Sequence, residues 1–363
     1  MRCCKVPLAA EFAAIAAGLL LAVQMPAQAQ TRTYYIAADD VFWNFAPSGQ
    51  DLILGRKLPP LQPLQLGWTY HKAIYREYTD ATFRQLKARP PQDAYLGVLG
   101  PVIRAEVGDK IVVVFKNQTR LHLSVHPHGV KYDKSSEGAP YSDETPRADK
   151  SDDAVAPGAT HTYTWTVPER AGPGPMDPSS IVWMYHSHTD EVRDIDTGPI
   201  GPIIITRRGM ARPDGSPKDV DLELITMFSH IDESQSRLLP ENLADPITNP
   251  RHVAGTPDTL QTADQFLTIN GFDYGNLPML TMRKGQKVRW YLFSSMDDDD
   301  FHAPTWHGQT VVYAGQRAST LMLGFMDMKV ADMVPDSVGT WLFDCGLGVH
   351  RAAGMTARFT VLP

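Results

Sequence analysis

The chain of 363 residues carries the same order of strand-like motifs twice, and this repetition is the strongest constraint on its fold. Residues 107–117 read VGDKIVVVFKN, and residues 284–295 read KGQKVRWYLFSS. Each stretch is followed by a histidine motif, VHPHG in the first half and TWHG in the second. Later, SIVWMYHSH in the first half parallels GTWLFDCGL in the second. A pattern that recurs at domain length predicts two similar domains in one chain.

Both halves are rich in β-branched and aromatic runs that are separated by turn residues. Stretches such as THTYTWTVP and GPIIITR are typical of strands, and the 27 glycines and 29 prolines suit many short turns. No long stretch has a convincing helical periodicity. We therefore predict an all-β protein of two β-sandwich domains, residues 30–208 and residues 220–363, joined by a polar linker at residues 209–219.

The first 29 residues are typical of an export signal. Arg2 and Lys5 supply a positive start, residues 12–25 are mostly apolar, and residues 27–29 form a small-x-small cleavage site. The apolar run is too short to span a bilayer comfortably, and no later stretch predicts a spanning helix. We expect a periplasmic or secreted protein that has no membrane attachment after the signal is removed.

The charge and the cysteines restrict the function further. A formal net charge of −7 argues against a nucleic-acid partner. Cys3 and Cys4 would leave with the signal, so the mature chain would keep Cys345 alone. In an oxidising compartment such a thiol is either buried and inert or held by a metal. Cys345 begins the pattern C-x4-H-x4-M with His350 and Met355, which favours the metal.

A family resemblance covers nearly the whole mature chain. It is carried by YREYTDATFR, YLGVLGPVIRAEVGDKI, YHSHTDEVRDIDTGPIGPIII and LTINGFDYGNLPMLTMRKGQKVRWYLF. These stretches resemble the first two domains of ceruloplasmin and hephaestin, within the multicopper oxidase superfamily. The resemblance implies two cupredoxin-like Greek-key β-sandwich domains and copper as the cofactor. Similar domain pairs occur in blood-clotting cofactors with degenerate copper ligands, so the fold alone does not decide the function.

The resemblance assigns a mononuclear blue-copper site to the second domain, with His302, Cys345, His350 and Met355 as ligands. Two imidazoles and one thiolate hold a blue copper in a trigonal plane, with a distant thioether on the axis. The thiolate and thioether favour Cu(I) and the imidazoles accept Cu(II), so this ligand set suits electron transfer.

The histidine motifs of the first domain form a second candidate copper site. His126 and His128 are two residues apart, as are His186 and His188, so on a strand both members of each pair project to the same side. The resemblance implies that these four histidines supply half of the trinuclear copper cluster with which multicopper oxidases reduce O2.

The chain departs from the complete oxidase pattern. The resemblance predicts further cluster histidines in the second domain, but only His307 is present. The lost pair beside Cys345 would also form the usual electron path to the cluster, so that path is broken here. The positions at which a family ligand is replaced are Leu123, Ser187, Thr305, Asp344 and Gly346.

Several functions are compatible with this set of retained and replaced ligands. The first is a copper oxidoreductase that takes single electrons from a small reductant or metal ion, and that assembles as a ring such as a homotrimer. In the second, another multicopper chain supplies the missing half-cluster. The third is an electron-transfer or copper-binding protein that does not reduce O2. A copper nitrite reductase is a further variant, but the missing histidine beside Cys345 argues against it.

Two acidic stretches have separate interpretations. Asp149, Asp152 and Asp153 lie where the resemblance to the first ceruloplasmin domain implies a calcium site, and clustered carboxylates suit a hard cation. Asp297–Asp300 precede His302 almost directly and could attract a metal-ion substrate or a basic partner.

Overall fold

The computed structural model describes residue 1 and residues 29–261, 263–295 and 301–363. The predicted export signal, apart from its first and last residues, and the acidic run Asp297–Asp300 lie outside the described residues. Within the described part of the chain, no helix is both long and apolar enough to cross a membrane.

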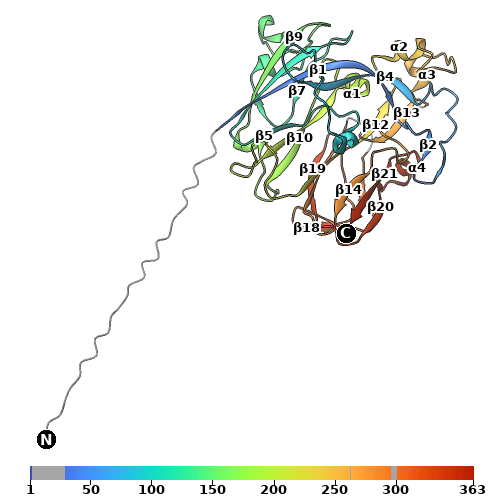
Figure 1. The fold of residues 1–363 in the computed structure, drawn as a ribbon. Helices are drawn as coiled ribbons and strands as arrows, with labels where there is room; N and C mark the ends of the chain where they lie inside the picture. Colours follow the sequence, from blue (N-terminus) through green and yellow to red (C-terminus); the bar gives the residue numbers. More distant parts are fainter. Residues whose placement is uncertain (2–28, 262, 296–300) are drawn as a thin grey trace.

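Two sheets are built from strands of the first half (Figure 1). One has the order β4 (Thr69–Tyr78), β1 (Thr31–Asn44), β6 (Lys110–Asn117), β9 (Thr160–Thr166) and β8 (Lys131–Tyr132). The other has the order β5 (Ile103–Glu106), β11 (Ile200–Thr206), β10 (Ser180–His186) and β7 (His126–Pro127). A small hairpin pairs β2 (Gln50–Asp51) with β3 (Arg56–Lys57).

Two further sheets are built from strands of the second half. One has the order β13 (Gln265–Ile269), β12 (Leu222–Asp232), β15 (Val288–Ser294), β19 (Met328–Met333), β17 (Val311–Tyr313) and β18 (Gln316–Ala318). The other has the order β14 (Leu280–Arg283), β21 (Thr356–Leu362), β20 (Gly339–Cys345) and β16 (Pro304–Trp306).

The strands of the two halves pair in corresponding ways. β1 runs parallel to β6 as β12 does to β15, and β5 runs parallel to β11 as β14 does to β21. The antiparallel pair β7–β10 corresponds to the pair β16–β20. The all-β prediction is confirmed by these sheets, whereas the proposed boundaries at residues 208 and 220 stay a prediction.

The described helices are short and lie in the connections. They are α1 (Glu191–Thr197), α2 (Leu239–Ala244), α3 (Pro257–Leu260) and α4 (Gly348–Ala352), with 3-10 turns at Pro91–Leu96, Lys134–Ser136, Arg147–Lys150 and Glu169–Ala171. α1 follows the His186–His188 motif, and α4 follows Cys345. Both helices therefore lie in the loops that carry or adjoin the candidate ligands.

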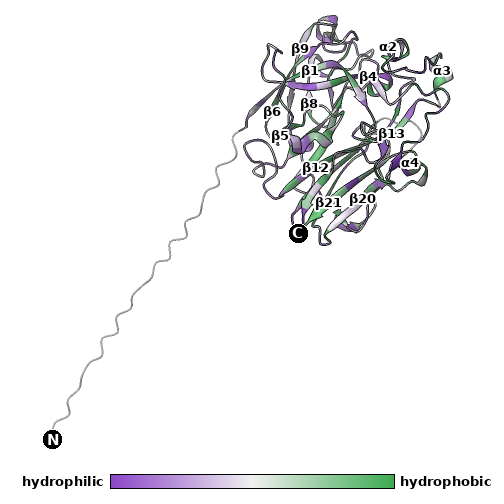
Figure 2. Ribbon diagram, turned by 45° about the vertical axis from the view of Figure 1, so that its right-hand side comes forward, coloured by the Kyte–Doolittle hydropathy of each residue, from purple (hydrophilic) through white to green (hydrophobic). Residues whose placement is uncertain are grey.

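The sequence pattern explains which strands face the core. In β6 the buried residues alternate, with Ile111, Val113 and Phe115 all inaccessible to solvent, so one face of this strand packs inward. β11 and β15 are buried along their whole length, and Figure 2 shows hydrophobic colouring along strands of the interior. The mostly apolar sequence of β11 fits a strand that is covered on both faces, and β15 departs from this pattern at the buried Arg289.

The halves also pack against each other. Leu99 and Met184 of the first half belong to the same buried apolar cluster as Trp290 of the second half. The guanidinium of Arg289 on β15 is fully buried and donates to the hydroxyls of Ser179 and Ser180 at the start of β10, each at 2.7 Å. This contact fixes β10 relative to β15, and β10 ends at one of the candidate ligands.

Candidate metal centres

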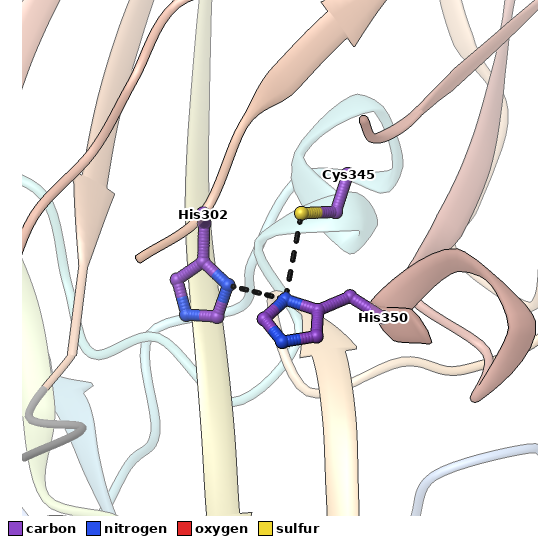
Figure 3. A group of neighbouring side chains, drawn as sticks. All are labelled: His302, Cys345 and His350. Atoms are coloured by element: carbon purple, nitrogen blue, oxygen red, sulfur yellow. Dashed lines mark hydrogen bonds between the residues drawn. The ribbon is translucent and has the colours of Figure 1, made fainter. Parts of the chain in front are cut away.

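The side chains of three predicted ligands of the second half converge on one another (Figure 3). Cys345 is the last residue of β20, and His350 lies on α4, which begins three residues later. His302 precedes β16, which pairs with β20 so that Pro304 lies opposite Cys345. A strand end, a short helix and a neighbouring strand thus bring the three side chains together.

The distances between the three side chains fit a shared metal. Nδ1 of His302 lies 3.3 Å from Nδ1 of His350, and Sγ of Cys345 lies 3.5 Å from the latter nitrogen. All three ligand atoms lie within 4.8 Å of one another, and all three residues are buried. In a trigonal site with metal–nitrogen bonds of about 2.0 Å and a metal–sulfur bond of about 2.3 Å, the ligand atoms lie roughly 3.5 Å apart.

The backbone holds Met355 in the same loop. The N–H of Cys345 donates to the carbonyl of Met355 (3.1 Å), and the N–H of Met355 donates to the carbonyl of His350 (3.1 Å). The thiol of Cys345 also accepts the N–H of Ala303 (3.2 Å). Met355 is fully buried. The structure therefore brings three of the four predicted side chains together and ties the fourth residue to them through its backbone.

The four histidines of the first half lie together as well. His126 and His186 are register partners in the β7–β10 pair, and the N–H of His128 donates to the carbonyl of Met184 (2.9 Å). His188 follows β10 by two residues. The ring centroids of neighbouring histidines in this group are 5.0 to 5.7 Å apart. We call these four residues the histidine cluster.

Backbone carbonyls orient the rings of the cluster. Nδ1 of His126 lies 2.6 Å from the carbonyl oxygen of Glu137, and Nδ1 of His186 lies 2.9 Å from that of Ser187. A carbonyl can only accept, so each Nδ1 carries the proton and each Nε2 keeps its lone pair. Nε2 of His128 and Nε2 of His186 lie 3.0 Å apart, which is a geometry that a bridging cation or a single proton would satisfy.

Burial favours the neutral form of three of these imidazoles. It lowers the pKa of His126, lowers the pKa of His128 to about 4, and lowers the pKa of His186 well below its usual value, with the neighbouring imidazoles adding to the effect in His128 and His186. Neutral imidazole is the form that binds metals. Nε2 of His188 lies 3.0 Å from a carboxylate oxygen of Glu191 on α1. The spacing of three residues before a helix could have predicted this contact, but the sequence analysis missed it.

His307 lies apart from the cluster and contacts an acid of its own half. Its Nε2 is 3.3 Å from Oδ1 of Asp344, and among the described residues it makes no ring contact with the four histidines. Burial raises the pKa of Asp344, although His307 and Arg351 oppose this effect. Within one chain, the structure therefore does not join His307 to the other predicted cluster histidines.

The strand register relates the two sites residue by residue. Thr305 pairs with Asp344 in β16–β20 as His126 pairs with His186 in β7–β10. Thr305 and Asp344 thus occupy the second-half counterparts of two cluster histidines. His307 is then the counterpart of His128, the one cluster position that keeps an imidazole in both halves.

The same comparison locates the first-half counterpart of the site around Cys345. The hydroxyl of Ser187 accepts the N–H of Ser124 (3.1 Å), as the thiol of Cys345 accepts the N–H of Ala303 (3.2 Å). Leu123, directly before Ser124, takes the place of the imidazole ligand. The backbone of the site is retained, but a hydroxyl and an isobutyl group replace the thiolate and the imidazole.

The three predicted calcium ligands differ in burial. Asp152 and Asp153 are buried, whereas Asp149 is exposed on a 3-10 turn. One oxygen of Asp152 accepts the N–H of Gly138 (2.7 Å), and the other has no hydrogen-bond partner. Burial, together with the charge of Asp152, raises the pKa of Asp153 to about 6. Within the described chain, the three carboxylates do not form a cluster of ligand atoms as close as that at His302.

Comparison with known proteins gives a consistent set of similarities. A family model described as multicopper oxidase matches residues 96–209. The chain is 39% identical over 343 residues to ferroxidase HEPHL1 of Mus musculus, covering 92% of this chain and 29% of that protein. It is 39% identical over 344 residues to ceruloplasmin of Homo sapiens, covering 91% of this chain and 32% of that protein. The chain therefore spans about a third of the length of these relatives.

Solved structures with similar folds include two copper enzymes. The multicopper oxidase mgLAC matches with a TM-score of 0.60 and 18% identity over 92% of this chain and 86% of that chain. The copper nitrite reductase of Nitrosomonas europaea matches with a TM-score of 0.59 and 16% identity over 91% of this chain and 94% of that chain. At these identities the likeness concerns the fold, and it confirms the predicted cupredoxin-like β-sandwiches.

Proposed function

Because this chain belongs to the multicopper oxidase superfamily, we propose that it is an exported copper oxidoreductase that takes single electrons from a small substrate or a metal ion. The electrons would enter at a blue copper held by His302, Cys345, His350 and Met355. The histidine cluster would hold further, non-blue copper. Relatives that carry the name ferroxidase make Fe(II) the first substrate to test.

One observation carries this proposal: a buried thiol and two imidazole nitrogens converge at 3.3 and 3.5 Å. A bound copper would supply a one-electron Cu(II)/Cu(I) couple, which suits this mixed sulfur and nitrogen donor set. The protein's part is to hold the donors in place and to exclude water from them. The Ala303 N–H at 3.2 Å from Sγ stabilises the thiolate form of Cys345.

A second candidate, an electron-transfer protein that does not reduce O2, is favoured by the residues beside Cys345. Asp344 offers a carboxylate in place of an imidazole, and Gly346 offers no side chain. A Cβ atom at Gly346 would lie 2.7 Å from the hydroxyl of Thr305, so that hydroxyl occupies the adjoining space. These residues give electrons no imidazole route out of the site through its sequence neighbours.

We propose an assembly in which the cluster meets a second chain, because a single chain does not bring His307 to the cluster. A homotrimer would set the first half of one subunit against the second half of the next. The alternative partner at the cluster is a separate multicopper chain or an electron-transfer protein. Export to the periplasm or the medium agrees with the sequence of the first 29 residues.

Calcium is proposed for the acidic loop of the first half. The support is the buried oxygen of Asp152 that has no hydrogen-bond partner and the raised pKa of Asp153. A hard divalent cation would supply the missing partner and would favour the ionised carboxylates.

The deciding experiment counts copper per chain and records its electron paramagnetic resonance spectrum, together with O2 uptake in the presence of Fe(II). Blue and non-blue copper with O2 uptake would support the oxidoreductase. Blue copper alone, without O2 uptake, would support the electron-transfer protein. A copper-loaded protein that lacks a blue absorption band would contradict both.

A further inference from the structure

The first-half counterpart of the site around Cys345 has a different set of contacts. In the second half the sulfur of Cys345 faces His350 on α4. In the first half the hydroxyl of Ser187 donates to Oδ2 of Asp194 on α1 at 2.6 Å. The N–H of Asp190 donates to the same oxygen at 3.0 Å. A carboxylate has therefore taken the position at which the second half presents a metal ligand.

Arg237 of the second half reaches into this site. Its Nη1 donates to Oδ1 of Asp194 at 2.5 Å and to the carbonyl of His122 at 2.9 Å. The backbone N–H of Arg237 donates to the hydroxyl of Thr197 at 2.9 Å. The side chain of Asp194 is fully buried, and that of Arg237 is 16% exposed. Removing one partner of a buried pair leaves an uncompensated charge, so loss of the Arg237 guanidinium should disturb the surroundings of Asp194 strongly.

A continuous series of hydrogen bonds leads from this pair to the histidine cluster. Asp194 accepts from the hydroxyl of Ser187, and that hydroxyl accepts the N–H of Ser124 (3.1 Å). The hydroxyl of Ser124 in turn accepts the N–H of His188 (3.0 Å). The backbone of one cluster histidine is thus fixed at the end of a series that begins at Arg237.

Residues 232–235 of the second half also hold α1 by hydrogen bonds. The N–H of Asp232 donates to a carboxylate oxygen of Asp196 (3.0 Å), and the guanidinium of Arg193 donates to the carbonyl of Gln235 (3.3 Å). α1 also carries Glu191, which contacts the ring of His188. Both the backbone and the ring of His188 therefore depend on where α1 lies.

We propose that Arg237 is a positioning residue for the histidine cluster. It fixes Asp194, and through Ser187 and Ser124 it fixes His188, so the second half sets how tightly the first half binds its metal. The metal-binding part of this inference rests on the proposed function of the cluster. The positioning part does not, because it concerns contacts within the metal-free chain.

The test uses the full-length protein with Arg237→Met, which keeps an unbranched apolar stem and removes the guanidinium with its charge. Hydrogen exchange of residues 186–197 is measured without metal, and Cu(II) affinity is measured by competition with a chelator. We expect faster exchange in this segment and roughly 10-fold or more weaker non-blue Cu(II) binding, which is the usual effect of losing a residue that orients a ligand. The blue absorption should not change.

Arg237→Lys keeps the charge and should restore most of the affinity. The matched control is Arg120→Met: Arg120 also joins the halves, through Asp40 and Glu241, but does not contact α1. Arg120→Met should change neither the hydrogen exchange of residues 186–197 nor the Cu(II) affinity. If Arg237→Met does not fold, Ser187→Ala breaks the same series while it leaves the ion pair intact.

Two results would overturn the inference. One is unchanged exchange at residues 186–197 in Arg237→Met. The other is faster exchange in that segment with unchanged affinity for non-blue Cu(II). If the wild-type protein binds only blue copper, the proposed function of the cluster fails, and the exchange measurement still decides whether Arg237 positions His188.

Discussion

Nε2 of His307 lies 3.3 Å from Oδ1 of Asp344 in the second half. At the corresponding positions of the first half, Nε2 of His128 lies 3.0 Å from Nε2 of His186. An imidazole pair of one half is an imidazole–carboxylate pair in the other. Arg351, 3.6 Å from Asp344, adds a cation to this position. If the chain works as proposed, a carboxylate in place of an imidazole would make this position a weaker copper site and would remove an imidazole from the electron path.

Slow oxidation of the blue copper by O2 is the first expected consequence. The sequence neighbours of Cys345 offer no imidazole, so the reduced protein alone should recover its blue colour slowly in air. Restoring the pattern with Thr305→His, Asp344→His and Gly346→His, with added copper, should speed recovery. Stopped-flow absorbance after anaerobic reduction measures it, and recovery within milliseconds in the wild-type protein would contradict the prediction.

Gly346→Ala should destabilise the second half by about 1–2 kcal/mol, because the new Cβ atom would lie 2.7 Å from the hydroxyl of Thr305. That hydroxyl is held by the carbonyl of Ala303 and by Thr320, so it moves aside at a cost. The cost should be smaller in a Thr305→Ala background. Urea unfolding of the two single variants and the double variant measures the coupling, and strictly additive costs would refute the contact.

Cys345→Ser should abolish the blue absorption without unfolding the protein. The colour of such centres arises from charge transfer between thiolate and copper, and a hydroxyl is a poor substitute for this soft ligand. Absorbance and circular dichroism of the copper-loaded variant give the result. Met355→Leu is the comparison: it should keep the colour and raise the reduction potential, because the thioether that we propose as a weak copper ligand is lost.

His126→Ala combined with His186→Ala should remove non-blue copper and keep the blue absorption. The two residues are register partners, so the double variant takes one imidazole from each H-x-H pair of the cluster. Copper per chain and the resonance spectrum are the measurements. An unchanged copper content would mean that the cluster histidines do not bind copper.

The acidic loop should make stability depend on pH. The pKa of Asp153 is about 6 in the folded protein, above its ordinary value of 3.8, so folding favours the protonated acid. The stability from this proton is fully present below pH 3.8 and is lost as the pH rises through 6. Asp153→Asn should therefore reduce the change in the free energy of unfolding with pH by about 1–2 kcal/mol, after allowance for solvent screening.

Bound calcium should stabilise the same loop at high pH, where the proton on Asp153 is lost. Because the ion favours carboxylates, added Ca²⁺ should raise the melting temperature more at pH 8 than at pH 5. Asp153→Asn should remove this effect, and the exposed Asp149→Asn should leave it unchanged. A melting temperature that does not respond to Ca²⁺ at either pH would contradict the calcium proposal.

The sequence by itself determined the class of fold and showed which local groups are candidate ligands. Alternating or continuous apolar runs predict strands directly, because side chains on a strand alternate between two faces. The spacing of Cys345, His350 and Met355 indicates a metal loop, because residues in one tight loop can approach one point without help from distant elements. His126 with His128, and His186 with His188, are likewise readable as pairs that share a strand face.

Only the tertiary structure decided how those local groups meet. The closeness of His302 to His350 depends on the register of β16 against β20, and the pairing of His307 with Asp344 depends on the same register. The contact of Arg237 with Asp194 joins residues 43 positions apart. No local pattern encodes such contacts, because they arise from the packing of one half against the other, and a sequence specifies that packing only through the shape and chemistry of the whole core.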